Sequence, residues 1–243
     1  VLVTGASRGI GRAIAQGCAE AGATVAVHYH QSRDTAEALA SALGHGAQAF
    51  QADLTDPHAA RRLWDEVVGA FGRVHALVNN AAIAEPASPE APLDDWLAVW
   101  HRTMAANLTA VGVLCQAAVP HFAEKGGGRI VTLASRAAFR GDAPEYLAYA
   151  ASKAGVVALT RSIARGYGKQ GIAAFTIAPG FTRTDMAQPF IDRYGEAYAT
   201  DDLALARMTE PEDIAPLVVL LASGLADHAT GTTIDVNAGS YVH

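Results

Sequence analysis

The sequence has few of the features that mark secreted, membrane or disulfide-rich proteins. It holds two cysteines in 243 residues, which excludes a disulfide scaffold and favours a reducing compartment. No uninterrupted apolar run approaches the roughly 20 residues that a transmembrane helix needs, so no membrane span is expected. The apolar residues 1–3 lead at once into Gly5 and Arg8, which is typical of a buried strand entering a turn and not of a signal peptide. A cytoplasmic protein is expected.

Charge is also scarce. Charged residues make up 17% of the chain against 51% hydrophobic residues, and the formal net charge is -6. No block of basic residues occurs, which argues against nucleic acid or an anionic membrane surface as a partner. His28 and His30 have no further ligand cluster around them, so no metal site is expected. The apolar fraction is large enough for a folded core and excludes a disordered chain.

What the sequence does contain is a repeated alternation of short apolar runs and helical patterns. The runs predict strands at residues 1–3, 24–29, 47–52, 76–78, 129–134, 172–177 and 233–236. Helices are predicted at residues 9–21, 34–43, 57–71, 94–124, 145–170 and 211–222. Strands that are apolar through most of their length belong to a parallel sheet covered on both faces. We therefore expect an α/β fold: one Rossmann-type, doubly wound domain of about seven strands over residues 1–243.

One long irregular segment interrupts this alternation at about residues 181–209. It separates a predicted strand from the helix that follows. Long loops at such positions are often active-site lids, so this segment is the expected substrate lid.

A glycine-rich loop follows the first strand and opens the first helix. Its sequence, TGASRGIG, places glycines at positions 5, 9 and 11. Glycines permit a tight turn and a close approach of the backbone to a ligand. The helix N-terminus then presents free N–H groups and a positive dipole end, which suit a pyrophosphate. Nucleotide binding is the favoured interpretation of this loop.

Tyr149 and Lys153 form the second informative pattern. They are four positions apart, so an α-helix places both side chains on one face. An unperturbed tyrosine has a pKa of about 10, and a neighbouring ammonium group favours its charged phenolate. The pair therefore predicts a general acid/base whose pKa is lowered by Lys153.

Together these motifs resemble the short-chain dehydrogenase/reductase family, over essentially the whole chain. The glycine loop is similar to the family's TGxxxGxG loop, and Tyr149-x3-Lys153 is similar to its active-site motif. The resemblance implies an NAD(P)-dependent oxidoreductase that interconverts a carbonyl compound, such as a ketone or oxoester, and a secondary alcohol. It also implies a small-molecule substrate and a homotetramer or dimer, in which the long helices at residues 94–124 and 145–170 pair across an interface.

The resemblance assigns four catalytic roles. Ser135, at the end of a strand, would orient the carbonyl oxygen and stabilise its developing charge. Tyr149 would exchange the proton with that oxygen as general acid/base. Lys153 would hold the cofactor ribose and lower the pKa of Tyr149. Asn107 would position a water that continues the proton path.

The end of the second strand predicts the choice of cofactor. NAD-binding relatives usually place an acidic residue there, and this chain has His30, Gln31, Ser32 and Arg33 instead. Ser32 and Arg33, with Arg8 in the glycine loop, would bind a 2′-phosphate, so NADP(H) is the expected cofactor and NAD(H) the alternative. The full set of expected cofactor contacts is Gly5, Ser7, Arg8, Gly9, Ile10, Gly11, His30, Ser32, Arg33, Asp53, Leu54, Asn80, Ala81, Ala82, Tyr149, Lys153, Pro179, Gly180, Thr182 and Thr184.

Several positions depart from the family pattern. The interval from Ser135 to Tyr149 is one residue longer than usual, and the extra residue is expected to reshape the substrate pocket. Ala82 and Ala238 stand where the family has glycine, and Phe175 where many relatives have asparagine. Three arginines near the expected pocket, at positions 136, 140 and 183, are candidates for a substrate carboxylate or phosphate.

The substrate stays open at this stage. The general pattern is that of 3-oxoacyl-acyl carrier protein reductases, which is one alternative function. A cofactor-binding regulatory protein with weak catalysis is another, and the intact set of Ser135, Tyr149, Lys153 and Asn107 argues against it. An enoyl reductase is disfavoured because those relatives space tyrosine and lysine more widely.

Overall fold

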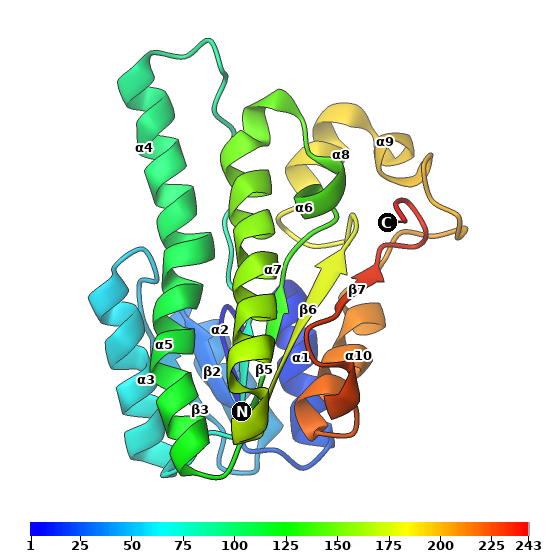
Figure 1. The fold of residues 1–243 in the computed structure, drawn as a ribbon. Helices are drawn as coiled ribbons and strands as arrows, with labels where there is room; N and C mark the ends of the chain where they lie inside the picture. The colour runs from blue at the N-terminus through cyan, green and yellow to red at the C-terminus, as the bar shows by residue number, and fades with distance from the viewer. Residues whose placement is uncertain (243) are drawn as a thin grey trace.

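The computed structural model describes residues 1–242 and is built on one parallel sheet (Figure 1). The order of its seven strands is β3-β2-β1-β4-β5-β6-β7, and every neighbouring pair is parallel. The strands are β1 (Leu2–Val3), β2 (Ala26–Tyr29), β3 (Gln48–Gln51), β4 (Ala76–Asn79), β5 (Gly128–Leu133), β6 (Ile172–Pro179) and β7 (Thr233–Val236). The chain runs outward from β1 in one direction and then returns to continue from β4, so the switch point lies between β1 and β4.

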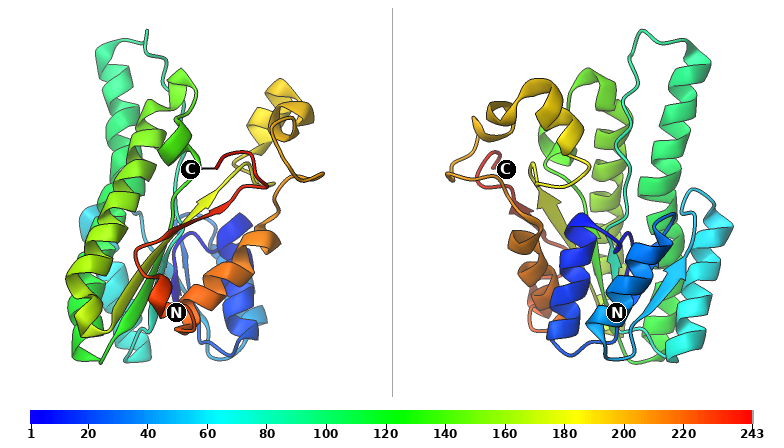
Figure 2. Two further views of the ribbon diagram at one scale, coloured as in Figure 1. Left: turned by 45° about the vertical axis from the view of Figure 1, so that its right-hand side comes forward. Right: turned by 180° about the vertical axis from the view of Figure 1, so that it is seen from behind.

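Helices cover both faces of the sheet (Figure 2). One face carries α1 (Gly9–Glu20), α2 (Arg33–Leu43) and α10 (Pro211–Ser223), and the other carries α3 (Pro57–Phe71), α5 (Ala110–Glu124) and α7 (Leu147–Tyr167). Two hydrophobic cores result, one on each side of the strands. This confirms the predicted doubly wound α/β fold, because strands buried on both faces need apolar side chains in both directions.

The structure differs from the predicted elements mainly where helices are short or interrupted. The helix predicted at 94–124 is divided into α4 (Leu93–Met104) and α5 by a π-helical turn, η1 (Ala105–Thr109). The helix predicted at 145–170 is α7 flanked by the 3-10 turns η2 (Pro144–Tyr146) and η3 (Gly168–Gln170). Short helices that were not predicted are α6 (Ala137–Arg140), α8 (Gln188–Tyr194), α9 (Glu196–Thr200) and the 3-10 turn η4 (Asp227–Ala229). Such pieces span too few residues for an apolar period to be read.

The continuous helical stretch Leu93–Glu124 is long and apolar enough to cross a membrane by length and composition alone. Half of its most apolar window is buried inside the structure, where α5 packs against α3 and α7. A core helix of a soluble protein passes the same test.

Two of the unusual residues have structural explanations. Phe175, in the middle of β6, is fully buried in the core beneath α1 and α10, so it acts as a packing residue. Ala82 is not among the described residues with positive φ, so the replacement of glycine there causes no backbone strain. Ala238 does have a positive φ, of 53°.

Candidate active site

A cavity of about 500 Å³ lies at the carboxyl ends of the parallel strands. Its wall combines the glycine loop after β1 with the ends of β2, β4, β5 and β6 and with part of the segment at 181–209. The cavity therefore spans the switch point between β1 and β4, which is where doubly wound sheets bind ligands.

The glycine loop is shaped by close backbone contacts. Gly5 and Gly9 have φ of 63° and 53°, a conformation that side chains with a Cβ rarely adopt. A Cβ on Gly11 would lie 2.2 Å from the carbonyl oxygen of Gly5, so only glycine fits there. The loop leaves the first turn of α1 on the cavity wall, where its N–H groups can bind an anion.

A polar network joins this loop to the end of β4. The Thr4 hydroxyl accepts hydrogen bonds from the backbone N–H of Asn80 at 2.9 Å and of Ala81 at 3.0 Å. The Asn80 side chain donates to the carbonyl oxygens of Thr4 at 2.9 Å and Gly5 at 3.1 Å. These bonds hold the two sides of the switch point at a defined separation.

His28 is a third support of the loop, and sequence reasoning missed it. Its Nδ1 accepts a hydrogen bond from the Gly5 N–H at 3.0 Å, and its Nε2 lies 3.1 Å from the carbonyl oxygen of Ala52. The first contact requires an unprotonated Nδ1, so the ring is neutral with its proton on Nε2. Burial lowers the pKa of His28 to about 4, in keeping with this assignment.

Ser135 and Tyr149 meet at the centre of the cavity. Ser135 follows β5 and accepts a hydrogen bond from the N–H of Ala137 at 3.1 Å, and its hydroxyl is hydrogen-bonded to Tyr149 near the start of α7. Burial raises the pKa of Tyr149 to about 12, the hydrogen bond from Ser135 opposes this shift, and the charge of Asp142 adds to it. Tyr149 is therefore a protonated acid at neutral pH in this structure.

Lys153 lies one turn further along α7 and is buried. Its Nζ donates to the carbonyl oxygen of Leu133 at 2.7 Å and lies 5.7 Å from the centre of the Tyr149 ring. Burial lowers the pKa of Lys153 to about 8. The predicted lowering of the Tyr149 pKa by Lys153 is wrong for this structure, because desolvation of the phenol dominates the shift and Lys153 is not among the groups that cause it.

Asn107 occupies the π-helical turn η1 and has no surface on the cavity. Its side chain accepts from the N–H of Ile83 and donates to the Ile83 carbonyl oxygen, both at 2.9 Å, and donates to the Ser152 hydroxyl at 3.1 Å. The side chain thus joins the segment after β4 to α7. Its predicted role in positioning a water stays a prediction.

The part of the cavity wall that follows β5 contains charges that the sequence indicated only in part. Arg136 is 6% exposed, and its Nη1 donates to Oδ2 of Asp202 at 2.9 Å. Arg140 donates to the same oxygen at 3.3 Å, and Asp142 stands on the same wall. The Arg136 guanidinium also lies 5.4 Å from the centre of the Phe181 ring.

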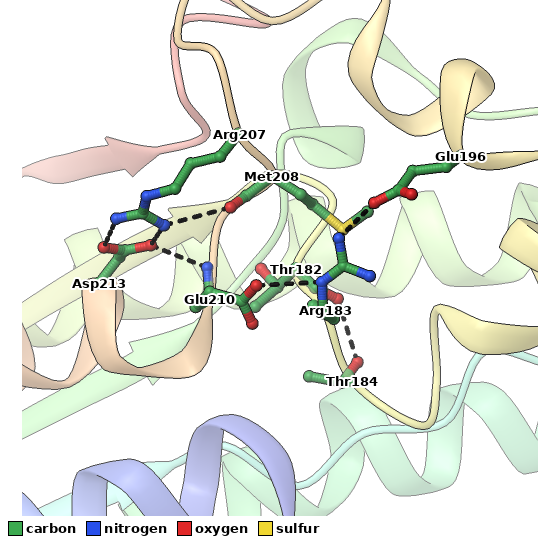
Figure 3. Close-up of polar contacts among 8 residues, drawn as sticks. All are labelled: Thr182, Arg183, Thr184, Glu196, Arg207, Met208, Glu210 and Asp213. Atoms are coloured by element: carbon green, nitrogen blue, oxygen red, sulfur yellow. Dashed lines mark hydrogen bonds and ion pairs between the residues drawn. The ribbon is translucent and has the colours of Figure 1, made fainter.

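Arg183 is directed elsewhere. It forms ion pairs with Glu196 and Glu210, while Arg207 pairs with Asp213 at the start of α10 (Figure 3). The Arg183 ion pairs connect the beginning of the segment at 181–209 with Glu196 inside it and with Glu210 just after it. Arg183 is therefore an anchor of that segment in this structure and not part of the cavity wall.

The cavity gathers nearly all of the predicted cofactor residues. The predicted set that lines it is Gly5, Ser7, Arg8, Gly9, Ile10, Gly11, His30, Ser32, Asp53, Leu54, Asn80, Ala81, Ala82, Tyr149, Lys153, Pro179, Gly180, Thr182 and Thr184. Arg33 does not line it, and its guanidinium lies 3.5 Å from Glu37 one turn along α2. Arg8 and His30 pair loosely with Asp185 at 3.4 Å and Asp53 at 3.7 Å.

Comparison with known proteins extends over nearly the whole chain. The family model described as Enoyl-(Acyl carrier protein) reductase matches residues 5–241. The 3-oxoacyl-(acyl-carrier-protein) reductase FabG of Staphylococcus aureus is 39% identical over 249 residues, which cover 99% of this chain and 97% of that enzyme.

Solved structures agree with the sequence comparison. A dehydrogenase/reductase from Sinorhizobium meliloti 1021 superposes with a TM-score of 0.90 at 36% identity, covering 99% of this chain and 94% of that one. A short-chain dehydrogenase from Burkholderia cenocepacia J2315, crystallised in complex with NADP, gives a TM-score of 0.88 at 37% identity and covers 98% and 96% of the two chains.

Proposed function

The chain belongs to the short-chain dehydrogenase/reductase family of NAD(P)-dependent enzymes, and from that premise we propose that it interconverts a carbonyl compound and a secondary alcohol with NADP(H). The observation that carries this proposal is the contact between Ser135 and Tyr149, with Lys153 beside them, in the same cavity as the glycine loop.

The residues of the cavity fit a dinucleotide. Gly5, Gly9 and Gly11 let the loop pack closely against its neighbours, and the first turn of α1 lies on the cavity wall, which suits a pyrophosphate. Lys153 would hold the ribose hydroxyls, Asp53 the adenine, and Thr184 the carboxamide of the nicotinamide. When bound, the dinucleotide supplies or accepts the hydride.

Two features support NADP(H) over NAD(H). The stretch after β2 that lines the cavity, His30 to Ser32, has no acidic residue to repel a 2′-phosphate, and Arg8 stands on the same wall. The related structure from Burkholderia cenocepacia was crystallised with NADP. Arg33 could contact a 2′-phosphate only if it broke its ion pair with Glu37. We therefore expect Arg33 to contribute less than Arg8 to the preference for NADP(H).

The catalytic groups have complementary tasks. The Ser135 hydroxyl orients the carbonyl oxygen by a hydrogen bond. The protonated Tyr149 donates its proton to that oxygen during reduction and accepts it back during oxidation. Asn107 keeps the segment after β4, which lines the cavity at Ile83, against α7.

Oxidation of NADPH with a panel of ketones, diketones, oxoacids and oxoesters tests the proposal. Turnover of at least one carbonyl substrate, and its loss in Tyr149→Phe, is the expected result. Binding of NADPH without turnover of any carbonyl compound would support a regulatory protein instead.

A second candidate is a 3-oxoacyl-acyl carrier protein reductase, favoured by the similarity to the Staphylococcus aureus enzyme. It predicts that an acetoacetyl group on acyl carrier protein is reduced much faster than the same group on a short thioester. An enoyl reductase, despite the description of the family model, is disfavoured by the narrow spacing of Tyr149 and Lys153.

We also propose a cytoplasmic homotetramer or dimer, and residues 181–209 as the substrate lid. Family membership supports the oligomer, as do the exposed apolar side chains of Leu93 and Leu147 on helices α4 and α7. A single sedimenting species with the mass of one chain would contradict it.

A further inference from the structure

We propose that Arg136 and Arg140 form a binding site for a carboxylate group of the substrate, and that Asp202 occupies this site when no substrate is bound. The inference rests on the proposed carbonyl reduction and narrows its substrate to small oxoacids or hydroxyacids.

Arg136 lies close to the proposed catalytic groups. It follows Ser135 directly in the chain and lines the same cavity, so a group bound to it lies beside the carbonyl that Ser135 orients. Its side chain is almost completely buried, and burying a guanidinium is costly without a partner. Burial and the positive charge of Arg140 both lower the pKa of Arg136, and the carboxylate of Asp202 opposes this shift, so an anion at this position stabilises the guanidinium.

Arg136 and Arg140 use only part of their donors on the residues that the structure describes. A guanidinium has five N–H donors and binds a carboxylate best through two parallel hydrogen bonds. Here one oxygen of Asp202 accepts from one nitrogen of each arginine, at 2.9 and 3.3 Å. The Asp202 carboxylate therefore makes neither of the two bidentate pairs that the arginines can offer.

A substrate carboxylate can displace Asp202 from the two arginines. Asp202 comes from the segment at 181–209, its side chain is 40% exposed, and Arg140 is 37% exposed, so water competes with their contact. Among the described residues, Arg136, Arg140, Asp142 and Asp202 are charged groups at this end, and their formal charges cancel. A substrate carboxylate that takes the place of Asp202 keeps this balance.

The walls around the site suit a short carbon chain. Phe181, Met186 and Phe190 line the cavity next to the arginines, and Phe181 packs edge-on against Phe190 with ring centres 5.8 Å apart. Apolar rings next to a paired arginine site would bind the aliphatic part of an oxoacid while its carboxylate is held by the guanidinium groups.

The test compares acids with their esters. Reduction of pyruvate, acetoacetate and levulinate by NADPH is measured beside that of their methyl esters, which keep the carbonyl and lose the charge. We expect at least one acid to exceed its ester at least tenfold in kcat/KM, since a charge-assisted pair contributes about this factor. Arg140→Gln should remove most of that preference, and Asp202→Asn should preserve or increase it.

Asp201→Asn, a change at the exposed neighbour of Asp202, is the matched control and should leave the ratio of acid to ester unchanged. If esters and acids are reduced equally at every chain length, the carboxylate site is wrong while carbonyl reduction stands. An equal loss for acid and ester in both Arg140→Gln and Asp202→Asn would likewise overturn it and make the cluster a structural latch.

If no carbonyl compound is reduced, the proposed function fails, and calorimetry with the same acids and esters in the presence of NADP+ decides the inference separately. Binding of an acid but not its ester, lost in Arg140→Gln, would support the site. Absence of binding by all three acids would refute it.

Discussion

At the scale of single residues, burial sets the protonation of the two central groups. The pKa of Tyr149 is raised to about 12 and that of Lys153 is lowered to about 8. Tyr149 is therefore a proton donor at neutral pH, as carbonyl reduction requires. Its role as a base in oxidation depends on the positive charge of the oxidised nicotinamide, which would favour the phenolate.

The Tyr149→Phe variant tests this role. It removes the donated proton and keeps the ring, so we expect kcat to fall by about 10²–10⁴-fold with little change in the Kd for NADPH. Steady-state turnover and fluorescence titration measure the two quantities. Tyr167→Phe, at the far end of the same helix, is the control and should turn over normally; wild-type turnover in Tyr149→Phe would rule out the mechanism.

The backbone of Ala238 is strained locally because the residue carries a Cβ. Its φ of 53° places the Cβ close to the backbone. Its carbonyl oxygen accepts a hydrogen bond from the N–H of Ala204 at 2.8 Å. We expect Ala238→Gly to raise the free energy of unfolding by about 0.5–1 kcal/mol, since relief of strain exceeds the entropic cost of glycine. Denaturant titration measures it.

Ala42→Gly, at an exposed position in the helix α2, serves as the control with the opposite sign. It should lower the free energy of unfolding by about 0.5–1 kcal/mol. A destabilised Ala238→Gly variant would mean that the neighbouring contacts, and not the backbone angle, determine stability at this site.

At the scale of elements, the segment at 181–209 is joined at its two ends. Thr182 and Thr209 form an isolated parallel bridge, and the Arg183 N–H donates to the carbonyl oxygen of Thr209 at 2.9 Å. The Arg183 side chain adds ion pairs to Glu196 and Glu210 (Figure 3). These contacts hold the two ends together, as the hinges of the proposed lid would require.

Arg183→Gln should loosen this segment without unfolding the protein. Both ion pairs are exposed and screened by solvent, so the Tm should change little. We expect faster limited proteolysis within residues 185–207 and a KM for substrate raised several-fold. Arg62→Gln, which breaks an exposed pair with Asp56 far from the lid, should leave both quantities unchanged; an equal effect in the two variants would contradict a lid.

At the scale of the whole molecule, stability should depend on the protonation of His28. Its pKa is about 4 in the folded protein, against 6.5 for an unperturbed histidine. The unfolded chain therefore binds the extra proton first as the pH falls. The stabilisation from His28 is complete above pH 6.5 and is lost as the pH falls through 4, and it amounts to about 3 kcal/mol.

The measurement is the free energy of unfolding between pH 7.5 and 4 in the wild type and in His28→Gln, which keeps an acceptor and a donor. The variant should show a shallower decline. The pKa values of His75 and His121 are also lowered by burial, so some decline should remain. Identical slopes in the two proteins would show that His28 is not the group that titrates.

Sequence patterns determined the fold class, the glycine loop and the relation of Tyr149 to Lys153. These features depend on the local period of apolar residues and on spacings within one loop or one helix, which a linear chain displays directly. Nearly all the cofactor contacts predicted in this way line the cavity, because the carboxyl ends of parallel strands meet at one edge.

Only the tertiary structure decided which distant groups meet and how burial changes their chemistry. The contact of Gly5 with His28 joins residues 23 positions apart, and that of Arg136 with Asp202 joins residues 66 apart. Neither contact is marked in the sequence by an apolar period or by a motif. The direction of the Tyr149 pKa shift likewise reversed from that expected, because desolvation depends on everything packed around a group and not on the one neighbour that a helical spacing reveals.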